Sequence, residues 1–181
     1  MLINTHMLMG RKIFENMDYD KKALIKETHF IWGNIKPDCV SKYKLKKHYK
    51  DESFIMIINK IEFLSNLSIK DLYTSYSINK FNQELGVICH FLCDYFCLPH
   101  NQRWEFKSAN IVKEHLIYEK NTEIKPTKVV EFLNEMLSEY ESDSSYENDL
   151  RYACYVCNTI MNMIINNIIE NEYKIRISNN L

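Results

Sequence analysis

Two short segments of the sequence each place an imidazole and a carboxylate four residues apart. His90 and Asp94 stand in the apolar stretch 85–99, and His115 and Glu119 stand in segment 107–120. Residues four apart share one face of an α-helix, so each pair presents two potential metal ligands together. A carboxylate in so apolar a helix is costly unless a cation compensates its charge. A metal ion is the simplest compensation, since Arg103 is the nearest arginine in the sequence.

Four further side chains could complete such a site. They are His6, Asp38, His48 and His100. Imidazoles and carboxylates without thiolates favour zinc with open coordination positions over a closed structural zinc site. Each histidine alone would more often be a core or surface residue, and His29 is interpreted as structural. The combined pattern predicts metal binding. The lysines around His48 are interpreted as a solvated loop that could also attract a phosphate-bearing substrate.

The composition limits the protein classes that could carry this site. The chain has 181 residues with 46% hydrophobic side chains, which is enough for one well-packed domain. Only 3 glycines and 3 prolines leave too few turns for a β-sandwich or barrel, so the expected fold is all-α. A net charge of −1 argues against a stable nucleic-acid partner.

The sequence also bears on where the protein acts. The first residues lack the basic start and small-residue cleavage site of a signal peptide, which gives a cytoplasmic expectation. No apolar run reaches the roughly 20 residues of a transmembrane helix. The cysteines 89, 93 and 97, like 154 and 157, stand about one helical turn apart, and all six cysteines are expected to be reduced and mostly buried.

Hydrophobic periodicity and capping residues predict the helices that must position the candidate ligands. The predicted helices cover 4–17, 20–32, 52–66, 68–98 with a break near Ser77, 107–120, 126–141 and 146–173. Gly33 and Pro37 are interpreted as the stop of the second helix, and 38–50 as a loop or short helix. Segment 85–99 should be buried all round. These elements make a single bundle over 1–173 with a frayed tail at 174–181.

Several helical or zinc-dependent hydrolase classes do not fit the motifs. The sequence has no H-E-x-x-H of a zincin, no adjacent His-Asp doublet and no Glu-x-x-His pairs of a di-iron bundle. The order of candidate ligands instead resembles the bacterial zinc-dependent phospholipases C, whose catalytic domain is all-helical and holds three zinc ions. The matching pieces run from Thr5-His6 through Pro37-Asp38, His48, the segment 85–95 and Pro99-His100 to His115 and Glu119.

The resemblance implies a distribution of ligands over three ions. One zinc would be held by His100, His115 and Glu119. A second would be held by His48, His90 and Asp94 with Asp38 beside it. A third would be held by His6 with Asp94 bridging, but the family's N-terminal Trp, whose amine and carbonyl bind that ion, is replaced by Met1-Leu2. Only the Met1 amine could substitute, so two to three Zn²⁺ ions are expected.

The function implied is zinc-dependent phosphodiester hydrolysis with a zinc-activated water, on a phospholipid or another phosphodiester. Asp38 is the candidate to orient or deprotonate that water, or to act as a further ligand. More distantly the chain resembles the single-strand-specific zinc nucleases, which typically end the pattern with H-x-x-x-D where this chain has Glu119. The alternatives are therefore a nuclease or other phosphoesterase on this scaffold, or a metal-binding helical protein without catalysis.

Overall fold

The computed structural model describes residues 1–40, 48–97, 123–143 and 145–179. Within these ranges every regular element is a helix and none is a strand, which confirms the all-α prediction. The elements are α1 (Ile3–Glu15), α2 (Tyr19–Lys22), α3 (Glu27–Cys39), α5 (Lys50–Ser65), α6 (Ile69–Thr74), α7 (Ile78–Tyr95), the 3-10 turn η1 (Pro126–Lys128), α9 (Val129–Ser142) and α10 (Tyr146–Asn179). No described helix is both long and apolar enough to cross a membrane.

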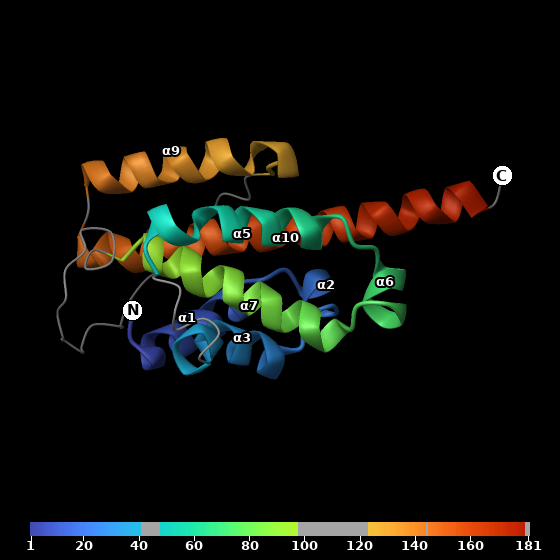
Figure 1. Cartoon of the computed structure of the whole chain (residues 1–181), viewed down its shortest axis with the longest axis horizontal. Helices are drawn as coiled ribbons and strands as arrows, with labels where there is room; N and C mark the ends of the chain where they lie inside the picture. Colours follow the sequence, from blue (N-terminus) through green and yellow to red (C-terminus); the bar gives the residue numbers. More distant parts are fainter. Residues whose placement is uncertain (41–47, 98–122, 144, 180–181) are drawn as a thin grey trace.

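Helix α7 forms the centre of the bundle. It contacts α1 and α3 on one side and α5 and α10 on the other (Figure 1). Every residue from 85 to 97 is buried, which confirms the expectation for this apolar stretch. The two polar side chains of that stretch, His90 and Asp94, are therefore carried into the middle of the molecule by the hydrophobic residues around them.

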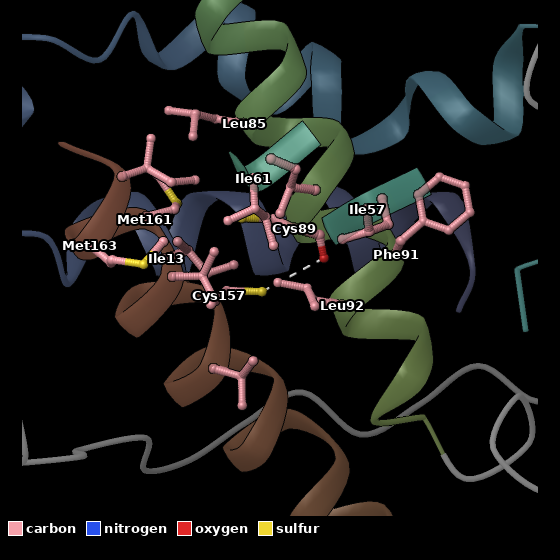
Figure 2. Packing of buried hydrophobic residues seen from close by; sticks show 14 of the residues in the cluster. Ile13, Ile57, Ile61, Leu85, Cys89, Phe91, Leu92, Cys157, Met161 and Met163 are labelled. Atoms are coloured by element: carbon pink, nitrogen blue, oxygen red, sulfur yellow. Dashed lines mark hydrogen bonds between the residues drawn. The ribbon is translucent and has the colours of Figure 1, made fainter. Parts of the chain in front are cut away.

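The hydrophobic core between α5, α7 and α10 closes the bundle on the side away from α3. Figure 2 shows Ile57 and Ile61 of α5 packed against Cys89 of α7, with Cys157 of α10 donating a hydrogen bond to the Cys89 carbonyl at 3.6 Å. The Sγ atoms of Cys93 and Cys157 lie 3.8 Å apart. All six cysteines are free, and Cys39 alone among them is exposed.

Two predicted helix boundaries were wrong for physical reasons. The segment 20–32 contains the short α2 and the start of α3, and α3 runs on through Gly33 and Pro37. Gly33 does not end a helix. It allows α3 to approach α7 closely, because a Cβ at this position would lie 2.1 Å from the carbonyl oxygen of Gln83 on α7. The predicted break near Ser77, whose φ is 85°, is confirmed.

Helix α10 also exceeds its predicted end at residue 173. It stays helical to Asn179, and its last turns extend beyond the rest of the bundle (Figure 1). In these turns the Arg176 Nε donates to the Glu172 carboxylate at 3.1 Å, four residues back. Such i,i+4 ion pairs favour the helical conformation of exposed turns. The segment predicted to fray is therefore helical over most of its length.

Candidate metal centre

The structure brings together candidate ligands from four separate parts of the chain. They are His6 of α1, Asp38 of α3, His48 just before α5, and His90 and Asp94 of α7. His100, His115 and Glu119 lie outside the described residues. Helix α3 packs closely on α7, and α1 contacts both helices, so His6, Asp38, His90 and Asp94 lie close together.

Asp94 lies at the centre of the group, and its two oxygens face different nitrogen atoms. Oδ2 accepts a hydrogen bond from His48 Nδ1 at 2.9 Å and lies 3.4 Å from His90 Nε2. Oδ1 lies 3.3 Å from His6 Nε2 and forms an ion pair with the amino nitrogen of Met1. Burial alone would raise the pKa of this carboxyl, but the Met1 amine and His6 hold the pKa well below its usual range. Asp94 is therefore ionised although it is fully buried.

His90 is held as a neutral imidazole. Its Nδ1 donates to the carbonyl oxygen of Asn34 at 2.8 Å, which leaves a lone pair on Nε2. His90 Nε2 lies 3.8 Å from Asp38 Oδ1 and 3.1 Å from His48 Nδ1. Burial, followed by the positive charge of His6, lowers the pKa of His90 well below its ordinary value. A neutral imidazole with its second nitrogen hydrogen-bonded to a carbonyl is the usual form of a metal ligand.

His6 stacks against His90, with ring centroids 3.8 Å apart. It is fully buried, and neither ring nitrogen has a hydrogen-bond partner among the described residues. Burial lowers the pKa of His6, but the neighbouring Asp94 carboxylate outweighs that effect and raises it to about 9. A buried polar ring without hydrogen bonds is costly, and a metal ion would satisfy it. Within the described residues His6 makes no hydrogen bond at Nδ1, and its Nε2 has the 3.3 Å ion-pair contact with Asp94, an arrangement that fits a cation bound between the two side chains.

Asp38 completes the group from the last turn of α3. Its side chain is 20% exposed, and its Oδ1 lies 3.8 Å from both His48 Nδ1 and His90 Nε2. Burial and the negative charge of Asp94 raise the pKa of Asp38 above its usual range, against the opposing charge of His6. Because it lies inside α3, it does not cap a helix N-terminus.

These side chains form two sets that could hold a metal ion. Ligand atoms of His6, Asp38 and His90 all lie within 4.8 Å of one another, and so do those of His48, His90 and Asp94. Zinc binds imidazole nitrogen and carboxylate oxygen at about 2.0–2.2 Å, so ligand atoms a few ångströms apart can surround one ion. The donor atoms are nitrogen and oxygen without thiolates, which fits zinc and leaves positions for water or substrate.

Comparison with known proteins identifies the kind of protein that carries this centre. Residues 5–168 match the family model of zinc dependent phospholipase C. The chain belongs to the zinc-dependent phospholipase C family. The match includes every residue of the two ligand sets as well as the segment with His100, His115 and Glu119. No curated protein and no solved structure matches the chain.

The zinc-dependent phospholipase C family and the nitrogen and oxygen donor atoms of the centre both indicate zinc. Zinc dependence comes from the family, and the two histidine and aspartate sets are the places in this chain that could bind it. The ligand group that the resemblance implies from His100, His115 and Glu119 lies outside the described ranges. The number of ions therefore stays a prediction of two to three.

Asn34 is a part of the centre that the sequence analysis missed. It is fully buried, its carbonyl accepts the hydrogen bond from His90, and its side-chain amide donates to the His6 carbonyl at 3.1 Å. One signal was present in the sequence: Asn34 stands four residues before Asp38 and directly after Gly33. Asn34 therefore shares a helical face with the candidate ligand Asp38. A polar residue in such a position can hold metal ligands in place.

Proposed function

We propose that this chain is a zinc-dependent phosphodiester hydrolase that acts on a phospholipid or another phosphodiester. Its family is one support, and the arrangement around Asp94 is the observation that carries the proposal. One buried carboxylate faces His48 and His90 with one oxygen and His6 with the other. When bound, zinc neutralises charge on the phosphate oxygens and lowers the pKa of the attacking water.

The described residues divide the work of binding. His48 and His90 would hold one ion with Asp94, and His6 would hold another with Asp94 shared between the two. His90 is suited to this because Asn34 fixes its Nδ1 proton and leaves Nε2 free to coordinate. By the resemblance of the sequence pattern, a further ion would be bound by His100, His115 and Glu119.

Asp38 would orient the attacking water and accept its proton. It differs from Asp94 in being partly exposed, so a water from solvent can reach it. Burial raises its pKa, and a carboxylate with a raised pKa accepts a proton more readily. Its Oδ1 lies 3.8 Å from His90 Nε2, which places it beside the ligand atoms.

Hydrolysis by the zinc-loaded protein tests this proposal. The substrates are a chromogenic phosphodiester, phospholipid vesicles and a single-stranded oligonucleotide, each with zinc and after removal of metal by a chelator. Asp94→Asn should abolish zinc-dependent hydrolysis. Asp149→Asn is the matched control, because Asp149 is also a buried carboxylate but binds the Tyr140 hydroxyl, at 2.5 Å.

The outcomes separate the candidate functions. Hydrolysis of the vesicles that requires zinc and Asp94 would support a phospholipase C-type enzyme. Cleavage of the oligonucleotide alone would favour the nuclease alternative. A protein that binds zinc fully and hydrolyses none of the substrates would be a metal-binding helical protein, and the proposed activity would be wrong.

A further inference from the structure

The glycines of this chain all gather around one residue. The sequence contains 3 glycines, and Gly10, Gly33 and Gly86 lie inside α1, α3 and α7 respectively. None of them has a positive φ, so conformational freedom does not explain their presence. Each instead has another helix so close that a Cβ would collide with it. The contacts of Gly10 and Gly86 include Asn34, and Gly33 directly precedes it in the sequence.

Two of the glycines bring α3 and α7 into backbone contact. A Cβ on Gly86 would lie 2.2 Å from the carbonyl oxygen of Phe30 and 2.6 Å from the backbone nitrogen of Asn34. Gly33 meets the backbone of α7 in the same way. At this short separation the main-chain carbonyl of Asn34 on α3 accepts the hydrogen bond from His90 Nδ1 on α7 at 2.8 Å.

The third glycine admits the side chain of Asn34 between α3 and α1. A Cβ on Gly10 would lie 2.8 Å from Asn34 Nδ2. Without that Cβ, Nδ2 donates to the carbonyl oxygen of His6 at 3.1 Å. Asn34 is therefore bonded to two of the proposed zinc ligands, through its backbone to one and through its side chain to the other.

We infer that Asn34 is a positioning residue of the metal centre, fixing the ring of His90 and the place of His6 on α1. The inference rests on the metal site of the proposed function. The side-chain oxygen of Asn34 has no hydrogen-bond partner among the described residues, although the residue is fully buried. A half-satisfied amide is a poor choice for core stability alone. Its contribution is instead the geometry of the two histidines.

Asn82 provides a matched control. It is also fully buried, and its amide donates to the Leu24 carbonyl at 3.2 Å while its oxygen accepts from the Lys26 backbone nitrogen at 2.9 Å. It therefore joins α7 to the segment before α3 as Asn34 joins α3 to its neighbours. It stands eight residues before His90, about 12 Å away along the helix axis.

The test compares Asn34→Ala with Asn82→Ala in the full chain. Zinc affinity is measured by competition with a chromophoric chelator, and the imidazole nitrogen signals of His6 and His90 are recorded by NMR in metal-free protein. Loss of a residue that orients metal ligands typically lowers affinity by about 10- to 100-fold. Asn34→Ala removes the amide that donates to the His6 carbonyl and keeps the main-chain carbonyl that accepts from His90. We therefore expect lower zinc affinity with a shifted His6 signal and an unchanged His90 Nδ1 proton for Asn34→Ala alone, and lower melting temperatures for both variants.

Two results would overturn the inference. One is an equal zinc affinity in the two variants, and the other is a wild-type His90 that carries its proton on Nε2. If Asn34→Ala does not fold, Gly10→Ala replaces it, because that change displaces the amide of Asn34 and should lower zinc affinity in the same direction. A wild-type protein that binds no zinc would contradict the proposed function, whereas the ring signals would still decide the role of Asn34.

Discussion

The rings of His6 and His90 stack at a centroid distance of 3.8 Å with an interplanar angle of 26°. Two imidazole rings at this distance cannot both be positively charged without strong repulsion. The asymmetry between them comes from their other neighbours. Asp94 raises the pKa of His6 to about 9, against burial, while burial and the charge of His6 lower the pKa of His90. In the absence of metal, His6 carries the positive charge and His90 stays neutral.

The metal-free protein should therefore lose stability as the pH rises above neutrality. The pKa of His6 is about 9 in the folded chain, against about 6.5 in an unfolded chain. A group whose pKa is higher in the folded chain stabilises the fold fully below a pH of about 6.5. This contribution, on the order of 3 kcal/mol for His6, is lost as the pH rises through the folded pKa. The test is the free energy of unfolding after chelation, measured from about pH 6 to about pH 10, a range that includes both pKa values of His6. His6→Gln should flatten the curve and His29→Gln should not; parallel curves for His6→Gln and wild type would contradict the assignment.

Purified protein should carry two to three zinc ions per chain, and a chelator should lower its melting temperature. The ligands come from separate helices, so binding energy contributes directly to folding stability. Elemental analysis of protein prepared without chelator gives the stoichiometry, and thermal melts before and after chelation give the coupling. Less than one tightly bound metal per chain would refute the whole assignment of the site.

His90→Ala should lose zinc and stability together. The change removes the residue common to both ligand sets and leaves Asp94 buried with one imidazole fewer. Loss of a residue that only orients a metal ligand lowers affinity by up to about 100-fold. Loss of the ligand His90 itself should lower zinc affinity by more than that. His29→Ala is the control, since His29 lies on α3 outside both sets. Equal metal content and equal melting temperatures in the two variants would count against His90 as a ligand.

Asp38→Asn should separate catalysis from metal binding. General-base contributions are typically about 10²–10⁴-fold, and a loss of hydrolysis in that range is expected. The pKa of Asp38 is raised by burial, so its charged form is disfavoured in the fold and its removal should not destabilise the metal-free protein. Zinc content, melting temperature and hydrolysis are measured on one sample. Metal lost in step with activity would make Asp38 a ligand, and unchanged hydrolysis would remove it from the mechanism.

Gly86→Ala should destabilise the protein although alanine is the better helix former. Helix propensity favours alanine by about 1 kcal/mol. The new Cβ would lie 2.2 Å from the Phe30 carbonyl oxygen, so backbone must move. Overpacking of this kind costs typically about 1–3 kcal/mol or more. Gly10→Ala should cost less, because there the Cβ meets the end of the Asn34 side chain. Denaturant unfolding of both variants decides, and a Gly86→Ala protein as stable as wild type would contradict the close crossing.

The sequence predicts the parts of this protein that depend on local spacing. The i,i+4 separation of His90 and Asp94, in a stretch with apolar residues on every face, is enough to predict a buried helix with two ligands on one side. The break at Ser77 follows in the same way from local composition. Gly33 was misread because a glycine that ends a helix and a glycine that admits a second helix look alike in one sequence. Asn34 could not be assigned, since its role depends on which helices cross there.

Exposure differs sharply across the group of candidate ligands. Asp38 and His48 are 20% and 16% exposed, whereas His6, His90 and Asp94 are at 0%. This gradient has a kinetic meaning. An ion held by His6, Asp38 and His90 has solvent access on the Asp38 side alone among these three ligands, so its release is expected to depend on fluctuations of the bundle around the two buried histidines as well as on ligand affinity. Such a protein would keep its metal through dilutions that a shallow site of equal affinity would not survive.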